Sequence, residues 1–297
     1  LNSLARQTII PSAIYVYIAD GYPLPKETIG CEKYIYVKKG MLAQRALNYE
    51  HVTTEYLLML DDDLKLPDNA VETMLRLLEE YSADAISPDI FTNSSRPLLS
   101  ELMMVISGRM RPRRDDGIWG YKVMLNAGYS YNKHPKKTAY LSQTNAGACL
   151  LCRKEDFLQL RLSDELWVDK TKYPLGEDQV MYYKMHLCGL RVLTSFDSGI
   201  VHLDAGSTTA NSEDRLVNLI YSEYRNKLIF WYKFIYRYEK SAVKKMWAVV
   251  CLLYSYGVQM IKYSLHYLFG KKNIAKAFFS GIGDATKYIQ SKEYKRL

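Results

Sequence analysis

Short apolar runs alternate with helical patterns in the first part of the chain. Apolar runs of four to six residues predict strands at 13–18, 34–37, 55–60, 85–88 and 147–152. Apolar positions spaced three or four residues apart predict helices over 41–52, 67–81 and about 178–188. Strands that alternate with helices indicate an α/β fold of the Rossmann-like type, with a mostly parallel sheet flanked by helices.

The regular pattern stops in two places. Between Phe91 and Gln143 it is replaced by a long segment that we expect to be rich in loops, with a basic cluster at 109–114. After Asn211 the chain becomes helical, aromatic and basic. We therefore expect an α/β domain over 1–215 and a helical extension over 216–297.

Composition and charge narrow the class of protein. The 297 residues are 48% hydrophobic and 24% charged, which excludes wholesale disorder. The sequence has no uninterrupted run of 18 apolar residues, so it does not predict a membrane-spanning helix. Five scattered cysteines favour reduced thiols and a cytoplasmic location. Residues 221–297 hold 15 Lys and Arg against 4 Asp and Glu, a net +11, whereas residues 1–220 carry −3. A basic tail of this kind favours an anionic surface as partner.

Three consecutive carboxylates, Asp61, Asp62 and Asp63, follow the apolar run at 55–60. Their repulsion is best relieved by a cation, and oxygen ligands suit Mg²⁺ or Mn²⁺. Because side chains alternate along an extended chain, Asp61 and Asp63 can point the same way. The alternative is a solvated acidic turn that caps the next helix.

Two further positions allow both a chemical and a structural interpretation. Glu177 and Asp178 precede a helical run, where a carboxylate is either a helix cap or a general base. His202 follows a short apolar run and is either a structural histidine or a metal ligand.

The order of these features along the chain resembles the family 2 glycosyltransferases with the GT-A fold. The resemblance covers about residues 1–210. It is carried by EYLLMLDDDLKLPDNAVETM at 55–74, which is similar to the family's DxD strand and the helix after it, and by NAGACLLCRKEDF at 145–157 and LGEDQVMYYKMHLCGLRV at 175–192. The last two are similar to its acceptor-side strand and its Glu-Asp helix.

The resemblance implies a nucleotide site. Asp20 matches the residue that binds the nucleotide base, and Arg45 matches a basic residue of the same site. Asp61 would contact the ribose and the metal region, with Asp62 beside it in the nucleotide site.

The resemblance also implies metal-binding and catalytic residues. Asp61 and Asp63 would hold Mg²⁺ or Mn²⁺, and His202 would add a metal ligand. Asp178 matches the catalytic base, with Glu177 as a positioning or acceptor-contacting group. The implied reaction moves a sugar from a nucleotide-sugar donor to a glycan or lipid-linked acceptor, as rhamnosyl and galactofuranosyl transfer in bacterial surface polysaccharide synthesis do. One direct displacement would invert the anomeric centre, because no second nucleophile is evident.

The sequence departs from the family at its start. Residues 1–8 resemble the end of the helix that precedes the family's second strand, so the first strand is expected to be missing from this sequence. The central sheet would then lack one strand beside the nucleotide site.

The basic extension predicts contact with a membrane surface. The segment 246–260 is largely apolar but short, and Lys244, Lys245, Lys262, Lys271 and Lys272 flank it. Such a helix suits the interface of the inner face of the cell membrane. The alternative is a helical cap that packs on the catalytic domain.

Two other functions compete with sugar transfer. A nucleotidyltransferase that makes nucleotide sugars shares the α/β pattern, but its glycine-rich phosphate loop is not evident. A non-catalytic basic protein that binds membranes would explain the charge of the tail alone. Nucleic acid is not expected as a partner, because the basic residues are interleaved with apolar runs and no nucleic-acid module is recognisable.

Overall fold

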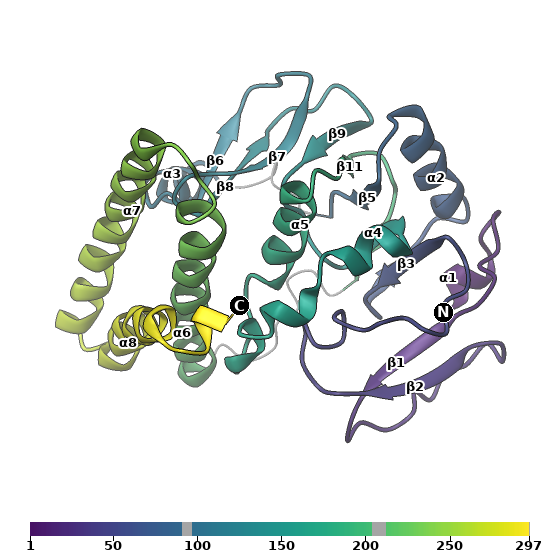
Figure 1. Cartoon of the computed structure of the whole chain (residues 1–297), viewed down its shortest axis with the longest axis horizontal. Helices are drawn as coiled ribbons and strands as arrows, with labels where there is room; N and C mark the ends of the chain where they lie inside the picture. Colours follow the sequence, from purple (N-terminus) through teal and green to yellow (C-terminus); the bar gives the residue numbers. More distant parts are fainter. Residues whose placement is uncertain (91–96, 204–211, 297) are drawn as a thin grey trace.

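A computed structural model describes residues 1–90, 97–203 and 212–296 of the chain. Figure 1 shows a small sheet beside the N-terminus, a central sheet with helices on its faces, and a group of long C-terminal helices at the opposite end. Residues 91–96 of the long segment predicted to be rich in loops, and the start of the helical region at Asn211, lie outside the described residues.

The strands of the described chain are mostly four or five residues long. They are β1 Tyr15–Ala19, β2 Lys33–Val37, β3 Tyr56–Leu60, β4 Leu64–Lys65, β5 Ala85–Pro88, β6 Met110–Arg113, β7 Trp119–Val123, β8 Tyr129–Asn132, β9 Ala139–Ser142, β10 Cys149–Arg153, β11 Val192–Ser195 and β12 Val201–His202. The α-helices are α1 Asn2–Ala5, α2 Ala70–Glu80, α3 Leu98–Ile106, α4 Lys154–Gln159, α5 Glu177–Leu187, α6 Glu213–Phe230, α7 Ala242–Leu268 and α8 Lys272–Gln290.

The central sheet has the strand order β3-β10-β5-β11-β9-β7-β8-β6, and helices flank it as predicted. Its strand directions are mixed, however, so the expectation of a mostly parallel sheet was wrong. Strand β10 is antiparallel to both β3 and β5, and β9 is antiparallel to β11. The reason is that β10 follows the strands β6–β9 instead of a crossover helix, so it enters the sheet from the opposite end.

Strands β1 and β2 form a separate parallel pair. A wide cleft with a volume of about 2120 Å³ lies between β1 and β3. Side chains of both strands line it, and it extends to the acidic residues that follow β3. The first two predicted strands are therefore present, in a sheet distinct from the central one.

The predicted helix over 41–52 is wrong, because this segment consists of turns. Asp169 accepts hydrogen bonds from the backbone N–H groups of Leu42 and Ala43 at 3.0 and 2.7 Å. Tyr49 adopts a positive φ of 49°, which a continuing helix does not allow. The apolar residues Leu42, Tyr49 and Val52 are buried in the core, but they reach it from turns and not from one face of a helix.

The segment expected to be rich in loops also contains more regular structure than predicted. It holds α3 and the four strands β6–β9. Strands β6, β7, β8 and β9 pair with one another within this segment, and β9 also pairs with a distant strand, β11. Strands of only four or five residues, separated by short turns, are too short to leave a continuous periodicity in the sequence.

The C-terminal helices pack on the part of the chain that carries the central sheet, through a shared hydrophobic cluster that includes Leu150 of β10, Met181 of α5, Tyr224 of α6 and Phe278 of α8. Helix α6 spans the predicted domain boundary at 215/216. In this way α6 ties the extension to the core that carries the site.

Candidate active site

The ends of three elements meet beside the cleft. Strand β10 runs antiparallel to β3, so the residues ahead of β10 lie next to those that follow β3, and the Asp61 N–H donates to the Ala148 carbonyl at 2.8 Å. The hydroxyl of Tyr182 on α5 donates to the Ala146 carbonyl at 3.1 Å. This contact holds α5, the helix that begins with Glu177 and Asp178, against the same point.

Arg45 connects the two acidic groups predicted from sequence. One guanidinium nitrogen lies 2.7 Å from Asp178 Oδ1, and the other lies 3.4 Å from Asp61 Oδ1 and 3.1 Å from the Gly147 carbonyl oxygen. Burial opposes the charge of Arg45, but Asp178 and Asp61 outweigh it and raise its pKa, so the guanidinium stays charged. Burial raises the pKa of Asp61, and Arg45 opposes that shift.

Gly147 lies where Asp178 and Arg45 meet. A Cβ atom at this position would collide with Asp178 Oδ1 and with Nη1 of Arg45. The loop is held in place by Asn145, whose side-chain amide donates to Thr194 Oγ1 at 3.1 Å and to the Ser87 carbonyl at 3.3 Å. Glycine is therefore required for the close approach of the two charged groups.

Glu177 and Asp178 differ in environment although they are adjacent. Glu177 is buried, and this burial, followed by the charge of Asp178, raises its pKa to about 8. Asp178 keeps a third of its side chain exposed and pairs with Arg45. Different surroundings of this kind let two neighbouring carboxyl groups take different chemical roles.

Asp63 and His202 come together across a short ribbon. Strand β12 pairs with β4 and places His202 opposite Leu64, and His202 Nε2 lies 3.0 Å from Asp63 Oδ2. The other carboxylate oxygen of Asp63 is buried without a hydrogen-bond partner. An orphaned carboxylate oxygen beside an imidazole fits a divalent cation. Within 1–90, 97–203 and 212–296, no group of three or more His, Cys, Asp or Glu side chains is already gathered as a metal site.

The remaining predicted residues lie around the cleft. Asp62 lines it together with Asp61 and Asp63. Asp20 is exposed at the end of β1, and its neighbours Ala19 and Tyr22 line the cleft. The structure thus brings Arg45, Asp61 and Asp178 into one network, pairs Asp63 with His202, and leaves Asp20 at the rim.

Sequence reasoning missed two residues that position this site. Asp169 fixes the turn that carries Arg45, through the N–H groups of Leu42 and Ala43. Tyr182 anchors α5 to the loop before β10. Tyr182 lies one turn after Asp178 on α5, and this spacing was available in the sequence; the contact of Asp169 with residues more than 120 positions away was not.

The geometry defines a wide cleft with a network of carboxylates and an arginine at its edge. Residues 31–159 match the family described as Glycosyl transferase family 2. This match agrees with the family resemblance inferred from the sequence, and it covers both the strand that precedes Asp61 and the strand that follows Gly147.

Comparisons with curated proteins and with solved structures were also made. None of the curated proteins matches the chain. The similar solved structures include the crystal structure of GalNAc-T7 with UDP, GalNAc and Mn²⁺, at 13% identity and a TM-score of 0.47. The match covers 77% of this chain and 46% of that chain, so this sequence spans less than half of that protein's length.

Proposed function

We propose that the chain is an inverting, metal-dependent glycosyltransferase, and that Asp178 is its catalytic base. The observation that carries this proposal is Arg45 held between Asp61, at the end of β3, and Asp178, at the start of α5. Through the buried Arg45, this contact couples a carboxylate on the cleft side to one on the α5 side, and both carboxylates remain partly exposed.

Each residue has a defined task in the proposed reaction. The acceptor hydroxyl oxygen forms a bond to the anomeric carbon, the bond from that carbon to the nucleoside diphosphate breaks, and the hydroxyl proton passes to the Asp178 carboxylate. Arg45 orients that carboxylate, and Asp20, Arg45, Asp61 and Asp62 form the nucleotide site. Mg²⁺ or Mn²⁺ held by Asp61, Asp63 and His202 would neutralise the charge that develops on the diphosphate.

The proposed acceptor is a glycan or a lipid-linked sugar in bacterial surface polysaccharide synthesis, with the enzyme peripheral on the cytoplasmic face of the cell membrane. The membrane location is supported by the exposed apolar face of α7, which includes Met246, Trp247 and Leu253. Lys244 and Lys245 lie at its N-terminal end. No helix in the described part of the chain is both long and apolar enough to cross a membrane.

The test separates nucleotide binding from chemistry. Calorimetric titration with UDP, GDP and dTDP, with Mn²⁺ and again with EDTA, should give metal-dependent binding of one nucleotide. Asp178→Asn should lower the rate of sugar transfer by about 100-fold to 10,000-fold, the usual contribution of a general base, with nucleotide affinity nearly unchanged.

Asp197→Asn, at an exposed position, is the matched control and should keep full activity. An equal loss of nucleotide binding in Asp178→Asn would show that Asp178 is not the base. Binding of no nucleotide, together with binding to anionic vesicles, would favour a non-catalytic membrane-binding protein.

A further inference from the structure

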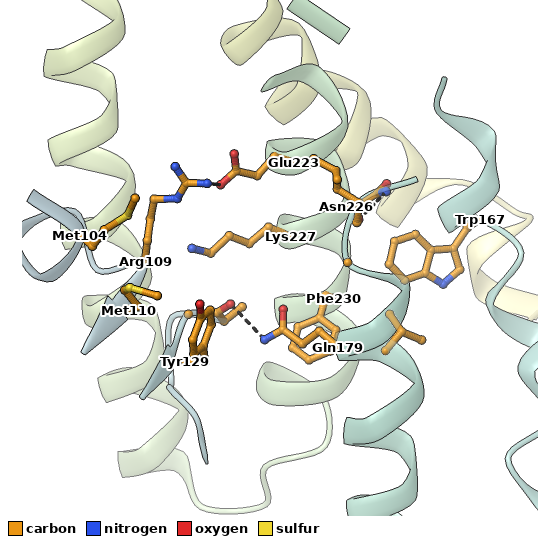
Figure 2. A pocket seen from close by; sticks show the side chains of 15 residues that line it. Met104, Arg109, Met110, Tyr129, Trp167, Gln179, Glu223, Asn226, Lys227 and Phe230 are labelled. Atoms are coloured by element: carbon orange, nitrogen blue, oxygen red, sulfur yellow. Dashed lines mark hydrogen bonds and ion pairs between the residues drawn. The ribbon is translucent and has the colours of Figure 1, made fainter. Parts of the chain in front are cut away.

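A second cavity, with a volume of about 270 Å³, lies between the catalytic part and α6. This is close to the lower limit of about 300 Å³ for small-molecule pockets. Its walls combine Met104, Met110, Tyr129 and Phe230 with charged side chains (Figure 2). An apolar cavity with a few polar groups is the usual form of a ligand site.

Lys227 on α6 extends across this cavity toward Arg109, as Figure 2 shows. Arg109 is paired with Glu223 at 2.7 Å, but the Lys227 ammonium has no hydrogen-bond or ion-pair partner in the part of the chain that the structure describes. An unpaired, partly buried ammonium is costly to the fold, so its presence points to a partner that arrives from outside.

The charges around Lys227 favour an anion. Burial lowers the pKa of Lys227 to about 8; Glu223 on the same helix opposes this shift, and Arg109 adds to it. Lys262 from α7 interacts with the same Arg109–Glu223 pair, and Tyr129 from β8 lines the cavity. Two lysines and an arginine around one glutamate give the cluster a positive net charge.

The cavity adjoins the proposed catalytic base. Gly176 and Gln179 line it, and the two residues between them are Glu177 and Asp178. The Gln179 side-chain amide donates to the Ala127 carbonyl at 3.2 Å, which closes the wall beside β8. A molecule bound here would lie within one helical turn of Asp178.

We propose that this cavity binds an oxyanion, a phosphate or a carboxylate group, of the sugar acceptor, with Lys227 as its cationic anchor. The inference rests on the proposed function, because it assigns the cavity to the acceptor of that reaction. The apolar walls would hold the part of the acceptor that adjoins the oxyanion, and the acceptor hydroxyl would then reach Asp178.

The test uses phenyl phosphate and benzoate as probes, with benzyl alcohol as the neutral control, in calorimetric titrations against the full chain. Phosphate or carboxylate binding should be detected, without binding of benzyl alcohol, and the stronger of the two probes identifies the chemistry of the oxyanion. Lys227→Met should weaken binding about tenfold or more. Lys276→Met, an exposed lysine on α8, should leave the affinity unchanged.

Two further measurements guard against a merely structural explanation. Lys227→Met and Lys227→Gln should melt at or above the temperature of the natural chain, because they remove an unpaired charge. The affinity for phenyl phosphate should fall roughly tenfold per pH unit above the Lys227 pKa of about 8, and should not do so in Lys227→Met.

The inference is overturned if neither probe binds, or if Lys227→Met binds them as well as the natural chain does. Those results would not affect the proposed function, which the nucleotide titrations test separately. Conversely, probe binding at Lys227 without any nucleotide binding would overturn the proposed function, and with it the assignment of the oxyanion to an acceptor.

Discussion

At the scale of single residues, the site depends on how closely charged groups can approach one another. Gly147 permits the contact between Asp178 and Arg45 because it carries no Cβ atom. Arg45 is largely buried and reaches both carboxylates and a backbone carbonyl. Removing one partner of such a network leaves a charge without compensation.

Gly147→Ala should lower sugar transfer by about 100-fold, because displacing a catalytic group by about 1 Å has an effect of that size. The assay is the rate of transfer, with melting temperature measured in parallel. Gly283→Ala on α8, where a Cβ atom has free space, is the matched control and should leave activity unchanged. Full activity in Gly147→Ala would show that transfer does not need this contact.

Glu177 predicts how stability changes with pH. Its pKa is raised from 4.5 to about 8 by burial and then by Asp178. Between these values the folded chain holds a proton that the unfolded chain has released, so the free energy of unfolding falls as the pH rises from about 4.5 to 8. Glu177→Gln removes this dependence.

The melting temperature of Glu177→Gln should therefore exceed that of the natural chain more at pH 8 than at pH 5, by about 2 °C or more. Thermal unfolding followed by circular dichroism at both values of pH measures the difference. Glu27→Gln, at an exposed position, is the control. A difference that does not change with pH would mean that Glu177 is already ionised in the folded chain at pH 5.

The residues that sequence could identify are those whose role depends on local spacing. Asp61 and Asp63 follow a strand, and Glu177 and Asp178 begin a helix, so their neighbourhoods were predictable. Their partners were not predicted by spacing. Arg45 reaches Asp178 over 133 positions, and Lys227 draws its significance from a cavity that exists only in the folded chain.

At the scale of elements, the alternation of strands and helices predicted the α/β class correctly but not the strand directions. Strand β10 lies between β3 and β5, and its reversed direction places Gly147 beside Asp61. The apolar residues of 41–52 have helical spacing, yet the segment forms turns. A hydrogen bond to Asp169 and the positive φ of Tyr49 prevent a continuous helix there. Both differences arise from contacts between distant segments.

Helix α7 carries the prediction about membranes, because its two faces differ. Ala248, Leu252 and Tyr256 are buried, whereas Met246, Trp247 and Leu253 are 65%, 58% and 64% exposed. Replacing the exposed three by serine should lower sedimentation with vesicles that contain phosphatidylglycerol by about tenfold, because apolar contact with the interface is lost.

The control replaces three exposed apolar residues at the opposite end of the molecule, Ile10, Leu24 and Tyr36, by serine. This variant should sediment with the vesicles as the natural chain does. If the α7 variant sediments with the vesicles as strongly as the control variant and the natural chain do, the exposed face of α7 does not bind lipid.

At the scale of the whole molecule, one hydrophobic cluster joins the part that carries the central sheet and the C-terminal helices. Charge asymmetry in the sequence predicted two regions of different character, and the structure places both around a common core. Arg225 of α6 donates to the Trp167 carbonyl at 3.0 Å, and the Trp231 indole donates to the Leu125 carbonyl at 2.8 Å. The composition of the tail could not predict these contacts, because they depend on which face of α6 is turned inward.

The contact between α7 and the segment after α3 has a consequence for which acceptors the enzyme could use. Ser255 of α7 donates to the Ser107 carbonyl at 2.8 Å, so α7 has a direct tie to the chain that leads into Arg109. With α7 resting on a lipid surface, Asp178 would stand at a set height above the headgroups. Acceptor chains too short to span that height could not be extended, so the depth of the fold would set a minimum glycan length.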